Sequence, residues 1–159
     1  MKYSGAVFAF LFSAFGSAQL QTARAVLEDN RQHAANDVYE AVIRYQIKSW
    51  DLAADLYCVK VNGKDANRAL LQHLKPLNVA EASACRQQAN SGGVLVVNRK
   101  TGKPSVLFDL EKIRWDTDST AEVNGGYTCG GRCAAGGTYH VTWDGSRWTV
   151  TKYDIRVQS

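Results

Sequence analysis

The chain has 159 residues, of which 19 are Lys or Arg and 15 are Asp or Glu, so its formal net charge is +4. This length supports one domain with its own hydrophobic core. The basic residues are spread along the chain among acidic ones, which argues against the concentrated cationic face expected of a nucleic-acid-binding protein.

The first residues have the three-part order of a secretory signal peptide. Lys2 supplies a positive charge, Gly5–Phe15 form an apolar run, and small residues at 16–18 precede a cleavage point. This run is shorter than the roughly 20 residues that a membrane-spanning helix needs, and no later stretch is apolar enough. We therefore expect a signal peptide over residues 1–18 and a single exported domain over residues 19–159, in the periplasm or outside the cell. A buried N-terminal helix is the alternative.

The segment from Asn36 to Trp50 is predicted to be a helix. Apolar residues recur along one face at the helical spacing i, i+3, i+4 and i+7, namely Val38, Ala41, Val42 and Tyr45. Asn36 or Asp37 is the expected N-cap, because its side chain can accept a hydrogen bond from the first turn.

A short strand and a short helix come next. The strand is expected over residues 55–61 and ends at Asn62-Gly63, a pair that tolerates positive φ and forms tight turns. Asp65 is expected to cap a helix over residues 66–74. Residues 77–92 are small and polar and are predicted to form a connecting loop.

From Gly93 onward the apolar residues alternate with a period of two, which is typical of strands. The predicted strands cover residues 93–100, 105–115, 121–128, 136–143 and 147–157. The alternation slips near Thr151 or Lys152, which indicates a β-bulge. Because the connections are short, we expect an antiparallel meander. Helices followed by strands predict an α+β fold, with N-terminal helices packed on a curved antiparallel β-meander, cone-like in form.

Four cysteines follow the predicted signal peptide, and an even number in an exported chain is most simply explained by two disulfides. Of the three pairings, we favour Cys58–Cys85 and Cys129–Cys133, because each joins neighbours in the sequence. The second pair has three residues between its cysteines and differs from the Cys-x-x-Cys motif of thioredoxin-like redox proteins. We therefore expect both pairs to be structural.

The same segment raises the question of a metal or phosphate site. Cys129, Cys133 and His140 could offer three metal ligands, with His73 or His33 as a fourth. Structural zinc sites use two close pairs of ligands, whereas this chain has one, and an oxidising compartment competes for the thiols. Its paired glycines lack the following Gly-Lys-Ser/Thr and helix of a phosphate-binding loop. We expect no metal and no cofactor.

Catalytic motifs are absent from the sequence. His33, His73 and His140 fall on different predicted elements, and none lies in a nucleophile elbow or a His-Glu-x-x-His helix. Asp109 and Glu111 alternate within one predicted strand and share a face, where an inward carboxylate could act as a general base. A solvated outer face is the interpretation that we favour.

A family resemblance adds to this interpretation. The helix over residues 38–50, the strand and turn YCVKVNGKD, and the C-terminal strands resemble the nuclear-transport-factor-2-like (SnoaL-like, cystatin-like) cone fold. More closely, EVNGGYTCGGRCAAGGTYHV followed by DGSRWTVTKYDIRV looks like the ending of small exported bacterial proteins of unassigned function. The resemblance implies a fold and leaves the activity open, because that fold contains enzymes, binding domains and oligomerisation modules.

Tyr and Trp dominate over Phe after the predicted signal peptide, which suits a pocket or a protein-binding face. The candidate binding residues are Tyr127, Tyr139, Trp143 and Arg132, the last at the tip of a disulfide-closed hairpin. We expect an exported, disulfide-stabilised domain that binds a protein partner or a small apolar ligand without catalysis, and a homodimer is compatible with this. The alternative is a SnoaL-like pocket enzyme, an isomerase, dehydratase or hydrolase, that uses an inward carboxylate.

Overall fold

The computed structural model describes residues 15–90 and 93–159. Side chains are described from Arg31 onward, except those of Gln32 and Asn90. Most of the predicted signal peptide lies outside the described residues, so it stays a prediction.

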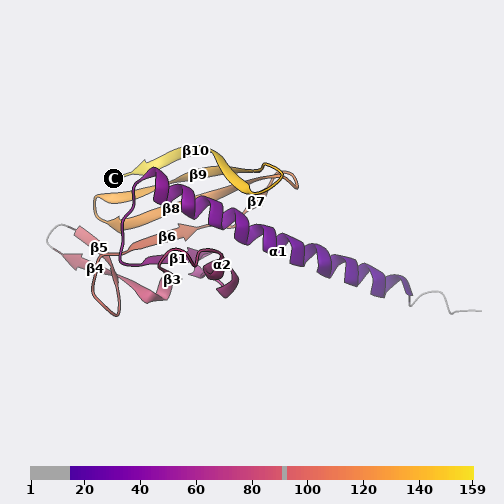
Figure 1. Cartoon of the computed structure of the whole chain (residues 1–159), viewed down its shortest axis with the longest axis horizontal. Coiled ribbons are helices and arrows are strands. Elements are labelled where there is room, and N and C mark those ends of the chain that lie inside the picture. Colours follow the sequence, from indigo (N-terminus) through magenta and orange to yellow (C-terminus); the bar gives the residue numbers. More distant parts are fainter. Residues whose placement is uncertain (1–14, 91–92) are drawn as a thin grey trace, which may run out of the picture. The chain divides into compact units, whose positions relative to one another are not determined.

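The chain divides into two compact units, of which the first ends at Ala34 and the second covers Ala35–Ser159. All ten strands that the structure describes, and the short helix α2, lie in the second unit (Figure 1). The candidate sites discussed below also belong to this unit.

Helix α1 covers Phe15–Ser49 and is longer than the helix predicted from Asn36. Asn36 and Asp37 therefore lie inside α1, and the prediction that either one is its N-cap was wrong. The preceding residues 19–35 are rich in Ala, Gln, Leu and Arg, whose helix propensities allow the helix to continue through a weak apolar pattern. Among the helices in the described part of the chain, none is long and apolar enough to cross a membrane.

Helix α2 covers Arg68–His73, close to the predicted helix. Its N-cap is Asn67, whose side chain accepts a hydrogen bond from the Leu70 N–H at 2.8 Å. Asp65, the expected cap, instead accepts a hydrogen bond from the backbone N–H of Ser83 at 2.8 Å. The prediction therefore found the helix but placed its start two residues too early.

The strands form one mostly antiparallel sheet, so the fold is α+β as predicted. They are β1 (Tyr57–Val61), β2 (Lys64–Asp65), β3 (Val79–Glu81), β4 (Cys85–Asn90), β5 (Gly93–Asn98), β6 (Val106–Leu110), β7 (Arg114–Trp115), β8 (Thr120–Gly130), β9 (Cys133–Trp143) and β10 (Trp148–Gln158). A short 3-10 helix, Ala82–Ala84, precedes β4. The main path through the sheet runs β10-β9-β8-β6-β1-β2.

The predicted meander is confirmed for β8, β9 and β10, which pair antiparallel in sequence order. Elsewhere the pairing differs from the prediction. β1 pairs in parallel with β6 and with β3, and β5 pairs mainly with β4. Residues 77–92, expected as a loop, contain β3 and β4. These strands were missed because β4, CRQQAN, is polar and exposed over most of its length and shows no alternation of apolar residues.

Glycines allow unusually close backbone contacts where β8, β9 and β10 meet. In the register of β8 and β9, Gly126 lies opposite Gly136. A Cβ atom at Gly126 would lie 2.1 Å from the carbonyl oxygen of Ala135, and one at Gly137 would lie 2.1 Å from that of Asp154. Such positions mark tight bends in a sheet. The predicted bulge is confirmed between Val150 and Lys152, and a second lies further along β10.

The second-unit part of α1 packs on one face of the sheet, here called the inner face (Figure 1). Val42 and Ile43 of α1 share a fully buried cluster with Phe108 and Tyr139 of the sheet. Burying such side chains stabilises the fold by about 1.5–3 kcal/mol each.

Both predicted disulfides are present in the structure. Cys58–Cys85 ties β1 to β4 and lies in a small buried cluster with Leu56 and Val96. Cys129–Cys133 closes the hairpin between β8 and β9. Because both pairs are oxidised, Cys129 and Cys133 offer no thiolate to a metal, which agrees with their predicted structural role.

Candidate functional site

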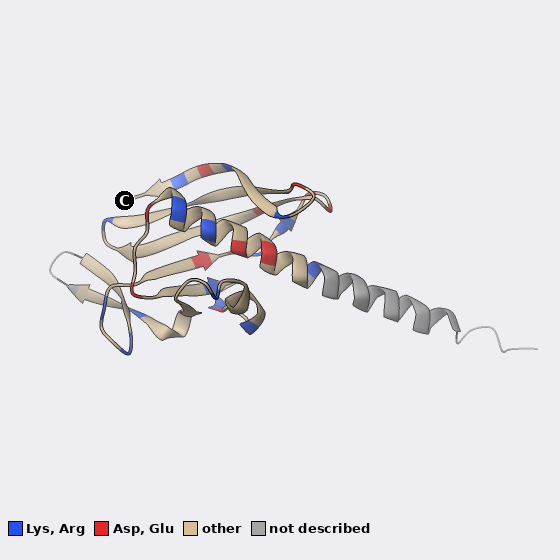
Figure 2. Ribbon diagram, viewed as in Figure 1, with Lys and Arg blue, Asp and Glu red and all other residues tan. Residues whose placement is uncertain are grey.

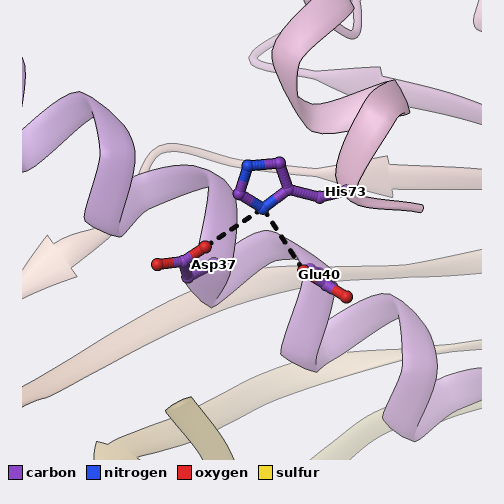
Figure 3. A group of neighbouring side chains, drawn as sticks. All are labelled: Asp37, Glu40 and His73. Carbon is purple, nitrogen blue, oxygen red and sulfur yellow. Dashed lines mark ion pairs between the residues drawn. The ribbon is translucent and has the colours of Figure 1, made fainter. Parts of the chain in front are cut away.

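Three side chains that the sequence does not place together converge between the two helices. Asp37 and Glu40 lie one turn apart on α1, and His73 is the last residue of α2. The Nδ1 atom of His73 lies 3.1 Å from Asp37 Oδ1 and 3.3 Å from Glu40 Oε2 (Figure 3). Both carboxylates therefore contact the same ring nitrogen. We call this group the His73 cluster.

Hydrogen bonds between the helices hold His73 in this position. The Asn67 side-chain amide donates to Asn36 Oδ1 at 3.3 Å, which ties the first turn of α2 to α1. Arg44 Nη2 donates to the backbone carbonyl of His73 at 3.2 Å, which ties the last turn. α2 is therefore anchored to α1 at both of its ends.

Arg44 also orients one of the two carboxylates. Its Nε donates to Glu40 Oε1 at 2.7 Å, while the other oxygen of Glu40 faces His73. Figure 2 shows acidic positions next to one another on α1, with basic positions on either side. The side chains of Asp37 and His73 are 44% and 32% exposed, so the His73 cluster is open to solvent.

A surface pocket of about 400 Å³ adjoins the His73 cluster. It lies between α1 and the hairpin joining β9 to β10, and its lining residues are Asp37, Glu40, Ala41, Arg44, Trp143, Ser146, Arg147 and Trp148. The indole rings of Trp143 and Trp148 lie 5.9 Å apart and are tilted against each other. The pocket thus combines two large aromatic surfaces with charged groups of both signs.

His140 also contacts two carboxylates, on the sheet face opposite α1, the outer face. Its Nδ1 lies 3.2 Å from Glu122 Oε1, and its Nε2 lies 2.8 Å from Asp154 Oδ2. The three residues come from β8, β9 and β10, so the ring bridges three neighbouring strands. We call this group the His140 cluster.

Further charges extend the His140 cluster at both ends. Arg114 pairs with Glu122, and Lys152 pairs with Asp154 at 2.9 Å. The Arg114 guanidinium is the main reason why the pKa of Glu122 lies below its ordinary value. The pKa of Asp154 is lowered by Lys152 and then by His140. Both carboxylates therefore favour the ionised form in which they bind these cations.

The structure does not bring the four predicted binding residues together. Tyr127 and Tyr139 are buried on the inner face, Trp143 lines the surface pocket, and Arg132 is exposed at the tip of the β8–β9 hairpin. Only Trp143 therefore contributes to the pocket described above. The other three stay predictions without a shared site.

Tyr139 belongs to a buried tyrosine group under α1. Its ring stacks on that of Tyr153 at 4.3 Å and meets Tyr45 edge-on at 6.1 Å. Burial raises the pKa of Tyr139, and the nearby Tyr153 hydroxyl raises it further. The two hydroxyls nevertheless do not meet the geometry of a hydrogen bond. Tyr139 is therefore a neutral core residue.

Several buried polar atoms in this region have no hydrogen-bond partner among the described residues. They belong to Gln46, Trp50, Tyr139 and Tyr153. Buried polar groups without protein partners are positions where ordered water binds. The space between α1 and the sheet is therefore polar in part.

Asp109 and Glu111 lie on the exposed side of the sheet. Asp109 pairs with Lys60 at 2.5 Å, and Glu111 accepts a hydrogen bond from the Asn124 amide at 3.3 Å. Asp109 lies between the buried residues Phe108 and Leu110, whose side chains face inward. Among the residues whose burial is described, no Asp or Glu is buried.

The His73 cluster was not predicted from the sequence. Asp37 was expected to be a cap, and His73 was considered either as an isolated histidine or as a fourth ligand beside Cys129, Cys133 and His140. The spacing Asp-x-x-Glu does place two carboxylates on one helix face, which is a detectable signal. What could not be detected is that α2 folds back against that face.

Comparison with protein-family models, with curated proteins and with solved structures found no match for this chain.

Proposed function

We propose that this chain is an exported, disulfide-stabilised domain that binds another protein through the pocket between α1 and the β9–β10 hairpin. The observation that carries the proposal is the pair of indole rings in that pocket, of which Trp143 is 38% exposed. An exposed indole beside a second one is costly in water and is typical of a binding surface.

The composition of the pocket favours a protein partner. Trp and Arg are enriched among the residues that carry most of the binding energy at protein interfaces, and the pocket contains two of each. Its charged groups, such as Asp37 and Arg147, suit the polar rim of an interface. A volume of about 400 Å³ can receive one or two side chains of a partner.

A small apolar ligand is supported less well. Small-molecule sites are lined mainly by apolar groups, whereas four of the eight residues lining this pocket are charged. The interior under α1 is no better suited, because an apolar ligand there would leave buried polar atoms such as those of Gln46 without partners.

Export and a cone-like fold are part of the proposal. Two disulfides are typical of proteins that leave the reducing cytoplasm, and they support export of this chain. The packing of α1 on one sheet face and the close contacts at Gly126 and Gly137 support the resemblance to nuclear-transport-factor-2-like proteins. The alternative of a SnoaL-like enzyme needs an inward carboxylate, and the buried residues that the structure describes include none.

Photo-crosslinking tests this proposal. A photoreactive residue in place of Ser146, which lines the pocket, should form an adduct with a partner protein in the native envelope fraction. Adding Trp143→Ala should reduce the adduct at least about tenfold, because loss of a central Trp typically costs 2 kcal/mol or more. Val94→Ser is the matched control, since Val94 is 40% exposed and lies outside the pocket.

Three outcomes would contradict the proposal. One is the absence of any adduct, and another is an equal loss of adduct in Trp143→Ala and Val94→Ser. The third is an adduct of twice the chain's own mass, which would identify a second copy of this chain as the partner. Circular dichroism of Trp143→Ala would show that the fold is retained.

A further inference from the structure

The geometry points to a binding site for one divalent transition-metal ion, Zn²⁺ before others, held by the His73 cluster. The ligands are His73 Nδ1, one oxygen of Asp37 and Glu40 Oε2. This inference does not depend on the proposed partner protein, because it concerns only groups within the chain.

The spacing of the ligand atoms fits a single bound ion. Two ligands about 2.1 Å from one ion lie about 3.0–3.4 Å apart when their angle is octahedral or tetrahedral. His73 Nδ1 lies 3.1 Å from the Asp37 oxygen and 3.3 Å from the Glu40 oxygen. All three ligand atoms lie within 4.8 Å of one another. An ion can therefore reach all three after only a small movement of the side chains.

Hydrogen bonds from Arg44 orient two of the three ligands. Metal-binding side chains are usually oriented by hydrogen bonds from residues that do not touch the ion. Arg44 holds Glu40 Oε1 at 2.7 Å and so turns Oε2 toward His73. The same guanidinium holds the His73 carbonyl at 3.2 Å. Two of the three ligands are thus positioned before an ion arrives.

The charge and the solvent exposure of the His73 cluster also suit a divalent ion. One imidazole and two carboxylates balance a doubly charged ion when the imidazole is neutral. Asp37 and His73 are 44% and 32% exposed, so water can fill the remaining coordination positions. Nitrogen as a ligand favours Zn²⁺, Ni²⁺ or Cu²⁺ over Mg²⁺ and Ca²⁺, which prefer oxygen alone.

The His140 cluster has the same residue types but cannot hold an ion in this way. Its carboxylates approach different ring nitrogens, Glu122 at Nδ1 and Asp154 at Nε2. The lone pairs of the two nitrogens point away from each other, so no single ion can bind the ring and both carboxylates. His140 is therefore a matched internal control for His73.

Isothermal titration calorimetry with ZnCl₂ tests the inference on the full exported protein, without a histidine tag and after treatment with a chelator. We expect one Zn²⁺ per chain. His73→Ala and Asp37→Asn should each weaken binding at least about tenfold. His140→Ala should leave the affinity within about twofold of wild type, and MgCl₂ should give no comparable heat.

Failure of wild-type protein to bind Zn²⁺ would overturn the inference. So would binding that survives His73→Ala, or that His140→Ala weakens as much. Asp37→Asn preserves the shape of the side chain and guards against a loss of binding through misfolding. Thermal unfolding without metal should confirm that each variant folds.

Discussion

His73 and His140 each contact two carboxylates, yet these carboxylates are arranged differently around the two rings. At His73 both oxygens approach Nδ1, whereas at His140 one oxygen approaches each nitrogen. The arrangement at His73 brings three possible ligand atoms close to one point. At His140, the ring instead connects two carboxylates on opposite sides. The residue types in a cluster therefore say less about its chemistry than the directions from which they approach.

The surrounding elements explain the difference. His140 lies opposite Glu122 in the β8–β9 register and opposite Lys152 in the β9–β10 register, so neighbouring strands place charges on both sides of its ring. His73 instead is the last residue of α2, which packs beside α1, and both of its carboxylate partners come from one face of α1. The sheet therefore places charged side chains on both sides of His140, whereas α1 places them on one side of His73.

The largest expected effect that separates the two clusters is stabilisation by zinc. With free Zn²⁺ at about 100 times its dissociation constant, binding should stabilise the folded protein by about 2.7 kcal/mol. This corresponds to a rise in Tm of about 5–10 °C for a domain of this size. Differential scanning fluorimetry should show that Asp37→Asn removes this rise and that Glu122→Gln retains it. An equal loss in both variants would break the distinction.

A smaller effect is expected on stability without metal. Both carboxylates at His73 approach the same ring nitrogen and must share it, whereas at His140 each ring nitrogen faces its own carboxylate, so that this ring links three strands. His140→Ala should therefore lower the Tm by about 2–4 °C near neutral pH, and His73→Ala by less than about 1 °C. Thermal unfolding in the presence of a chelator measures both. A greater loss in His73→Ala would show that the two roles are reversed.

The smallest effect concerns acid stability at the His140 cluster. Arg114 lowers the pKa of Glu122 below its ordinary value of 4.5, so the folded state binds this proton less readily than the unfolded state. The resulting stabilisation is complete above pH 4.5 and is lost as the pH falls through the folded-state pKa. Glu122→Gln and Arg114→Gln should both flatten the acid side of a Tm–pH profile, by less than about 2 °C. A profile unchanged in both variants would contradict this role.

Local features of the fold could be predicted from the sequence. The two disulfides were found from the spacing of the cysteines, and the bulge between Val150 and Lys152 from the slip in alternation. The strands β8, β9 and β10 were predicted correctly because short turns favour antiparallel pairing of consecutive strands. Each of these features depends on residues that are close together in the chain.

Features that depend on distant residues were missed. The parallel pairing of β1 with β6 joins segments separated by α2 and by the β4–β5 hairpin, and apolar periodicity reports the burial of a strand but not its neighbour. The His73 cluster was missed for the same reason. Asp37 and Glu40 have the spacing of a pair on one helix face, but nothing near His73 in the sequence indicates that its ring lies against them.

The most direct test of the zinc site is a crystal structure of the exported protein grown with Zn²⁺, with anomalous diffraction measured on both sides of the zinc absorption edge. The geometry predicts one anomalous peak at about 2.0–2.2 Å from His73 Nδ1 and from one oxygen each of Asp37 and Glu40. A zinc peak at His140 instead, or no ordered zinc at His73, would contradict the account.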